Sequence, residues 1–124
     1  MTAHQKEVQN TLRKLEDSNR ILAWYEASIR ELELRAQRAD KTSAKRYKTE
    51  IADLKKEKVK FEDDVQKAKE LIETCTDARG KRILQLRYIS MKRMEDIAYI
   101  MSYERTHLYR IYYKALDNIQ QMKH

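Results

Sequence analysis

The chain has 124 residues, of which only one is glycine and none is proline. β-Strands need turns, and turns depend heavily on those two residues, so the composition counts against a strand-rich fold and favours helices joined by few turns. Charged residues make up 38% of the chain and hydrophobic residues 41%. This balance favours long, solvated helices over one large core.

The formal net charge of +7 is unevenly distributed, because residues 1–76 contribute +2 and residues 77–124 contribute +5. A basic surplus suits a polyanionic partner, although charge alone does not distinguish DNA from RNA or an acidic membrane surface. No stretch approaches the roughly 18 apolar residues of a membrane span, and the N-terminus lacks the apolar core of a signal peptide. The single cysteine, Cys75, cannot form an internal disulfide. We therefore expect a soluble, cytoplasmic protein.

Two long amphipathic helices are predicted for the first part of the chain. Apolar residues recur seven apart in the first helix, at Val8, Leu15, Leu22, Ile29 and Ala36. After a polar interruption, which offers Thr42 or Ser43 as a helix cap, a second stripe runs from Ala44 to Cys75 in steps of three and four. Its one strongly polar member, Lys58, costs stability but can fix the register of a coiled coil. The sequence predicts an antiparallel, coiled-coil-like hairpin over residues 1–76.

A second set of apolar residues on the first helix lies off this stripe, at Trp24, Ala27 and Leu34. A lone hairpin would leave them exposed. They are candidates for a dimer contact or for docking of the C-terminal part, or Trp24 lies partly exposed along its own helix. A homodimer and a monomer both remain alternatives.

The C-terminal part, residues 77–124, is expected to form a domain of three short helices over about 78–89, 94–101 and 104–122. Asp77 can cap the first of them. Gly80 falls in the first turn of that helix, where its flexibility costs least.

The segment from Met94 to Tyr113 fits a helix-turn-helix. The small side chain of Ala98 lets two helices cross closely, and Ser102 stands at the turn, where a positive φ is wanted and glycine is usual. Five residues are placed to face inward, namely Ile97, Met101, Tyr103, Leu108 and Ile111. Ordinary amphipathic helix pairs also show such spacings. Three further tyrosines are expected in the core or in packing between domains, namely Tyr99, Tyr112 and Tyr113.

With Leu108 and Ile111 inward, the second helix of this pair should turn its N-terminal half toward a DNA major groove. Arginine can bond guanine with two hydrogen bonds, threonine can contact a base or a thymine methyl, and tyrosine can reach a phosphate or a base. The predicted readers are Arg105, Thr106, Tyr109 and Arg110. Backbone contacts are predicted for His107, Lys114, Lys81, Arg82, Lys92 and Arg93.

Residues 75–90 (Cys-Thr-Asp-Ala-Arg-Gly-Lys-Arg-Ile-Leu-Gln-Leu-Arg-Tyr-Ile-Ser), together with Asp-Ile-Ala at 96–98 and residues 108–116 (Leu-Tyr-Arg-Ile-Tyr-Tyr-Lys-Ala-Leu), resemble region four of bacterial sigma factors. The likeness is greatest to small phage-encoded regulators of the ArpU or RinA-like kind. It covers about residues 75–120 and implies that the helix over 104–122 reads promoter DNA. Two positions depart from the pattern, since Ser102 replaces the usual glycine and Glu104 stands where a serine or threonine cap is common.

These observations predict a sequence-specific, double-stranded DNA-binding regulator of phage or mobile-element genes in the cytoplasm of a bacterial host. The alternatives are a protein-binding adaptor that acts on RNA polymerase or a sigma factor, and an oligomeric phage DNA-packaging subunit. We expect neither catalysis nor a cofactor or metal. The three histidines are far apart, a glycine-rich phosphate loop needs more than one glycine, and the acidic run at residues 62–64 fits a solvated helix face.

Overall fold

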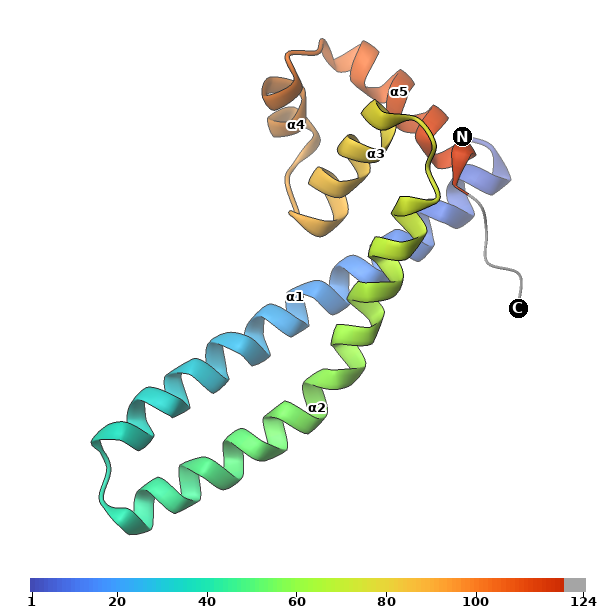
Figure 1. Cartoon of the computed structure of the whole chain (residues 1–124). Coiled ribbons are helices and arrows are strands. Elements are labelled where there is room, and N and C mark those ends of the chain that lie inside the picture. The colour runs from blue at the N-terminus through green and yellow to red at the C-terminus, as the bar shows by residue number, and fades with distance from the viewer. Residues whose placement is uncertain (120–124) are drawn as a thin grey trace. The chain divides into compact units, whose positions relative to one another are not determined.

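The computed structural model describes residues 1–119 and is all-α in this range (Figure 1). A long helical hairpin is followed by three short packed helices, as the sequence predicts. The elements are α1 (Ala3–Arg38), α2 (Lys41–Glu73), α3 (Ala78–Leu84), the π-helical segment η1 (Gln85–Ile89), α4 (Met94–Met101) and α5 (Arg105–Asn118). Residues 120–122 of the last predicted helix lie outside the described residues, and α5 ends at Asn118 with Ile119 extended.

The hairpin helices are 36 and 33 residues long, about 50 Å each at ~1.5 Å per residue. The cap of α2 is Asp40, not Thr42 or Ser43 as predicted. The carboxylate of Asp40 accepts the N–H of Ser43 at 2.8 Å, and its carbonyl accepts the N–H of Ala44. Donation from Ser43 stabilises the carboxylate and holds the pKa of Asp40 below its ordinary value.

Contacts divide the chain into two compact units: residues 1–17 with the chain from Val65 onward, and Ser18–Asp64. This division differs from the predicted boundary after Thr76. The two ends of the hairpin belong with the C-terminal helices, because Leu12 and Ile72 are buried in the same cluster as the apolar residues of α3 to α5.

The Ser18–Asp64 unit contains the connection between α1 and α2, and it confirms the predicted seam. Every member of the second stripe in this unit is at least partly buried, including Lys58, whose ammonium lies 3.7 Å from the Glu62 carboxylate. Its buried residues come from both helices, namely Leu22, Ile29 and Ile51. The off-stripe residues Trp24 and Leu34 are 60% and 53% exposed.

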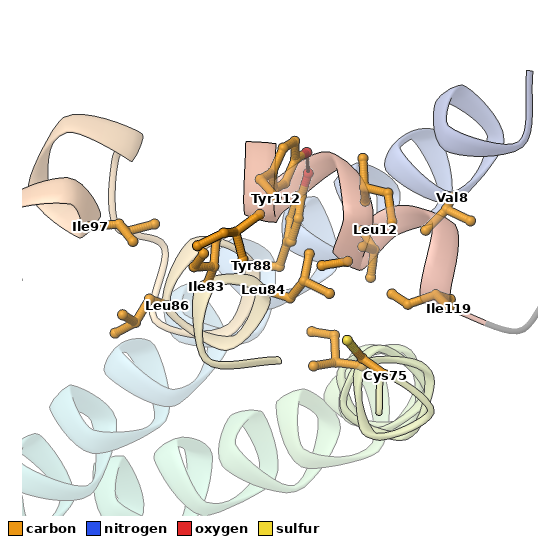
Figure 2. Packing of buried hydrophobic residues seen from close by; sticks show 14 of the residues in the cluster. Val8, Leu12, Cys75, Ile83, Leu84, Leu86, Tyr88, Ile97, Tyr112 and Ile119 are labelled. Atoms are coloured by element: carbon orange, nitrogen blue, oxygen red, sulfur yellow. Dashed lines mark hydrogen bonds between the residues drawn. The ribbon is translucent and has the colours of Figure 1, made fainter. Parts of the chain in front are cut away.

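The core of the other unit draws residues from every helix of the chain (Figure 2). Its fully buried side chains include Val8, Leu12, Ile72, Cys75, Ile83, Leu84, Tyr88, Ile97, Leu108, Leu116 and Ile119. One polar pair lies within it, because the hydroxyls of Tyr88 and Tyr112 are 2.6 Å apart. Burial raises the pKa of Tyr88, since the charged phenolate is poorly solvated there.

Gly80 marks the closest approach between α3 and α5. A Cβ at this position would lie 2.8 Å from the Cβ of Ala115, which is shorter than real Cβ contacts. Gly80 is therefore required by packing, and not only tolerated in a first turn. Its N–H donates to the Asp77 carboxylate at 2.9 Å, which confirms Asp77 as the cap of α3.

Candidate nucleic-acid interface

The turn between α4 and α5 has the geometry that the sequence predicts. Ser102 has φ 57° and ψ 42°, in the left-handed region, at the C-cap of α4. The N–H of Ser102 donates to the carbonyl of Tyr99 at 3.2 Å, and the N–H of Tyr103 donates to that of Ala98 at 2.9 Å. These bonds end α4 and reverse the chain, so that α5 begins only three residues later.

The inner faces of α4 and α5 also confirm the prediction. Ile97, Leu108 and Ile111 are buried, and Met101 and Tyr103 are partly buried against the same core. Among the three further tyrosines, Tyr112 is buried as predicted, whereas Tyr113 is 37% exposed and does not belong to the core.

The prediction for Tyr99 is wrong, because this side chain is 88% exposed. Ile97 and Met101 turn toward the core, and Tyr99 lies two residues from each. At about 100° per residue, it therefore falls on the opposite side of α4, which it shares with Glu95 one turn earlier.

The outer face of α5 carries the predicted polar and basic readers. Arg105, Thr106, Arg110 and Lys114 are all exposed. Thr106, Arg110 and Tyr113 follow one another in steps of four and three, so they share one face. In the described part of the chain, Arg105, Arg110 and Lys114 take part in no ion pair. Their positive charge is therefore available to an anionic partner.

Two predicted site residues on α5 are only partly accessible. Tyr109 packs against the core and has ring contacts with Tyr112 and Tyr113, at centroid distances of 6.2 and 6.0 Å. The guanidinium of Arg105 lies 5.7 Å from the ring of Tyr109, within cation–π range. The rings of His107 and Tyr103 pack in a T-shaped arrangement, with their centroids 4.8 Å apart. Tyr109 is thus less outward than predicted, and it supports Arg105.

The four predicted site residues outside α5 differ in how far their positive charge is compensated. Lys81 pairs with Glu73 at 3.1 Å, and Arg93 pairs with Glu95 and Asp96 at 3.1 and 3.4 Å. The two others are exposed and form no ion pair within the described residues, namely Lys92 and Arg82. Exposed pairs are weak, but they reduce the charge that Lys81 and Arg93 offer to a phosphate.

The C-terminal half of α5 is held by polar side chains of α1 that the sequence analysis missed. Gln5, which is 8% exposed, donates to the carbonyl of Tyr113 at 3.2 Å and to the Asp117 carboxylate at 2.9 Å. Gln9 donates to the hydroxyl of Tyr112 at 2.8 Å. Gln5 and Gln9 lie one helical turn apart beside the apolar stripe, and this position was the available signal.

A partly buried ion pair joins α1 to the π-helical segment. The carboxylate of Glu16, with a side chain only 5% exposed, accepts a hydrogen bond from the guanidinium of Arg87. The guanidinium also lies 5.1 Å from the ring of Tyr88. This contact ties η1 to α1.

The described residues contain no group of three or more His, Cys, Asp or Glu side chains arranged to hold a metal ion. None of the described helices combines the length and the apolar character needed to cross a membrane. The likeness to region four of sigma factors rests on the residues quoted for it, since no protein-family model, curated protein or solved structure matches the chain.

Proposed function

We propose that this protein binds double-stranded DNA sequence-specifically through α5 and regulates the transcription of phage or mobile-element genes. The observation that carries the proposal is the left-handed turn at Ser102. It sets α5 directly after α4 and leaves Arg105, Thr106 and Arg110 exposed at the N-terminal half of α5. That half is the part of a recognition helix that enters the major groove.

The charge of this face supports contact with a phosphate backbone. Arg110 and Lys114 lie one turn apart on α5, and the Arg105 guanidinium lies 5.7 Å from the Tyr109 ring and forms no ion pair with a carboxylate of the described residues. Arginine bonds guanine or phosphate with two parallel hydrogen bonds, which gives geometric specificity as well as affinity.

The test is selection of bound duplexes from a random pool, followed by binding measurements on the enriched site. We expect an enriched site, and we expect the affinity to fall steeply as salt rises. Replacing Arg105 and Arg110 with Ala should remove the preference for that site, at about 1–3 kcal/mol per lost base contact. The matched control is Arg30→Ala with Arg46→Ala, which removes the same charge from exposed positions of the hairpin. Selection without enrichment, or equal affinity of wild type and the Arg105/Arg110 variant, contradicts the proposal.

Two exposed residues on α4 favour a second candidate, an adaptor that acts on RNA polymerase or a sigma factor. Tyr99 and Ile100 are 88% and 48% exposed side by side, and large exposed apolar side chains are typical of protein contacts. Binding to purified polymerase without DNA that is lost with Tyr99→Ala and Ile100→Ala, but kept with Arg105→Ala and Arg110→Ala, would favour the adaptor.

The selected site also reports on the homodimer, which we retain as part of the proposal. A dimer presents two recognition helices to half-sites separated by about 34 Å, or multiples of that distance. We therefore expect the enriched sequence to have dyad symmetry if two copies bind together. Light scattering of the protein on this duplex gives the number of copies directly.

A further inference from the structure

A cavity of about 320 Å³ lies between the last turns of α2 and the segment formed by α3 and η1. Its walls come from α2 (Lys69, Ile72 and Glu73), from α3 (Arg82), and from η1 and its C-cap (Gln85, Ile89 and Ser90). All of them belong to the same compact unit. Volumes near this size are typical of sites for small ligands.

The electrostatics of the cavity favour an anion. Lys69 and Arg82 are exposed and form no ion pair in the described part of the chain. The one acidic lining residue, Glu73, is already engaged, because Lys81 donates to one carboxylate oxygen at 3.1 Å and Gln85 to the other at 3.5 Å. Two cations therefore remain without a carboxylate partner at the rim.

The backbone beside the cavity is unusual. The N–H of Ser90 donates to the carbonyl of Gln85 at 3.0 Å, which is the five-residue spacing of a π-helical turn. Met91, which follows, has φ 56° in the left-handed region. Both features cost energy in ordinary sequences, and π-helical turns are found frequently at functional sites. Here they bring Gln85 and Ser90 to the cavity that Arg82 borders.

We propose that this cavity binds a phosphate group attached to a less polar body. The Arg82 guanidinium and the Lys69 ammonium supply the charged donors that phosphate requires. The partly buried Ile89 supplies an apolar surface beside them for the carbon skeleton. The phosphate belongs either to a free phosphomonoester or to the backbone of bound DNA. The first source does not depend on the function proposed above.

The first arm of the test uses phenyl phosphate, with phenol as the uncharged comparison, at ionic strength held constant with chloride. We expect saturable shifts of the Gln85 and Ser90 amide resonances with a dissociation constant of about 1 mM or below. Lys69→Ala with Arg82→Ala should weaken binding about tenfold or more. The control is Lys67→Ala with Arg79→Ala, which removes the same charge from exposed positions on the same two helices that do not line the cavity.

The second arm measures DNA binding by the same two variants. If phenyl phosphate does not bind, but the Lys69/Arg82 variant loses more DNA affinity than the control and its salt slope falls by about 0.9, the phosphate is that of the DNA backbone. If phenyl phosphate binds and only the cavity variant loses it, the ligand is a free phosphomonoester. Equal losses in both variants, or no loss in either arm, overturn the proposal. Circular dichroism checks that each variant retains the helical content of wild type, and the Arg105/Arg110 variant tests α5 separately.

Discussion

The contact between Gly80 and Ala115 gives the sharpest test of how α3 holds α5. Two effects of Gly80→Ala oppose each other. Alanine stabilises a helix interior by about 0.5–1 kcal/mol relative to glycine. Its Cβ, however, would lie 2.8 Å from the Cβ of Ala115 and 3.5 Å from its Cα. Because Cβ of Ala115 is attached directly to the backbone, no side-chain rotation relieves the first contact.

Carbon atoms attract each other best at about 3.5–4.0 Å, so α3 and α5 must separate by roughly 1 Å to admit the new methyl group. Overpacking of this kind costs about 1–3 kcal/mol. After the gain in helix propensity is subtracted, we expect Gly80→Ala to lower the free energy of unfolding by about 1–2 kcal/mol. The packing effect is thus expected to exceed the propensity effect.

Urea unfolding followed by the near-ultraviolet circular dichroism of tyrosine is the appropriate assay. The only tryptophan, Trp24, lies in the Ser18–Asp64 unit, so its fluorescence reports on a different part of the chain. Ala115→Gly alone should also destabilise, because it removes a buried methyl group from a helix. In the double variant the clash disappears. Its loss of stability should therefore be smaller than the sum of the two single losses by about 1 kcal/mol or more. A Gly80→Ala protein at least as stable as wild type would refute the reasoning.

Three further predictions concern single side chains. Ser102→Gly should raise the free energy of unfolding by about 0.5–1 kcal/mol, because φ 57° suits glycine better than serine; a lower urea midpoint would argue against the left-handed turn. Tyr88→Phe should cost about 0.5–1.5 kcal/mol by removing the buried bond to Tyr112, and an unchanged midpoint would mean that this bond contributes nothing. The pKa of Asp40 is held below 3.8 in the folded chain, so its stabilising effect is complete above its unfolded pKa and is lost as the pH falls through the folded value. Asp40→Asn should therefore show a smaller loss of hairpin stability than wild type as the pH falls from about 5 through the folded pKa of Asp40, as followed by Trp24 fluorescence.

The periodicity of the sequence was sufficient to predict the hairpin and the inward faces of α4 and α5. A seam of steps of three and four permits only one buried side, and this side is the one observed from Ala44 to Cys75. Ser102 was predictable because a chain that reverses after a short helix needs one residue at positive φ. The cap at Asp40 was missed, because neighbouring polar residues are equally good caps and only the helix start separates them.

Other features depend on contacts that local sequence does not encode. The five-residue turn of η1 has no composition that distinguishes it from an α-helix. The pairing of Lys81 with Glu73 and the donation from Gln5 to Asp117 require elements to be placed in three dimensions. For this reason the sequence predicted the exposure of Arg105, Thr106 and Arg110 on α5, but not which distant residues hold its C-terminal half or compensate the basic charges nearby.

The hydrogen bond between His4 and Ile119 joins residues that are 115 positions apart, and the cluster that contains Val8 and Leu12 also contains Leu116. A nascent chain leaves the ribosome from its N-terminal end. The compact unit Ser18–Asp64 spans only 47 consecutive residues, so it can assemble early in synthesis, whereas the cluster that contains Val8 and Leu12 needs residues as far along the chain as Ile119. Until then these apolar side chains are open to chaperones or to other molecules. Synthesis of the chain as far as Ile119 is thus needed before the short helices can pack with these residues.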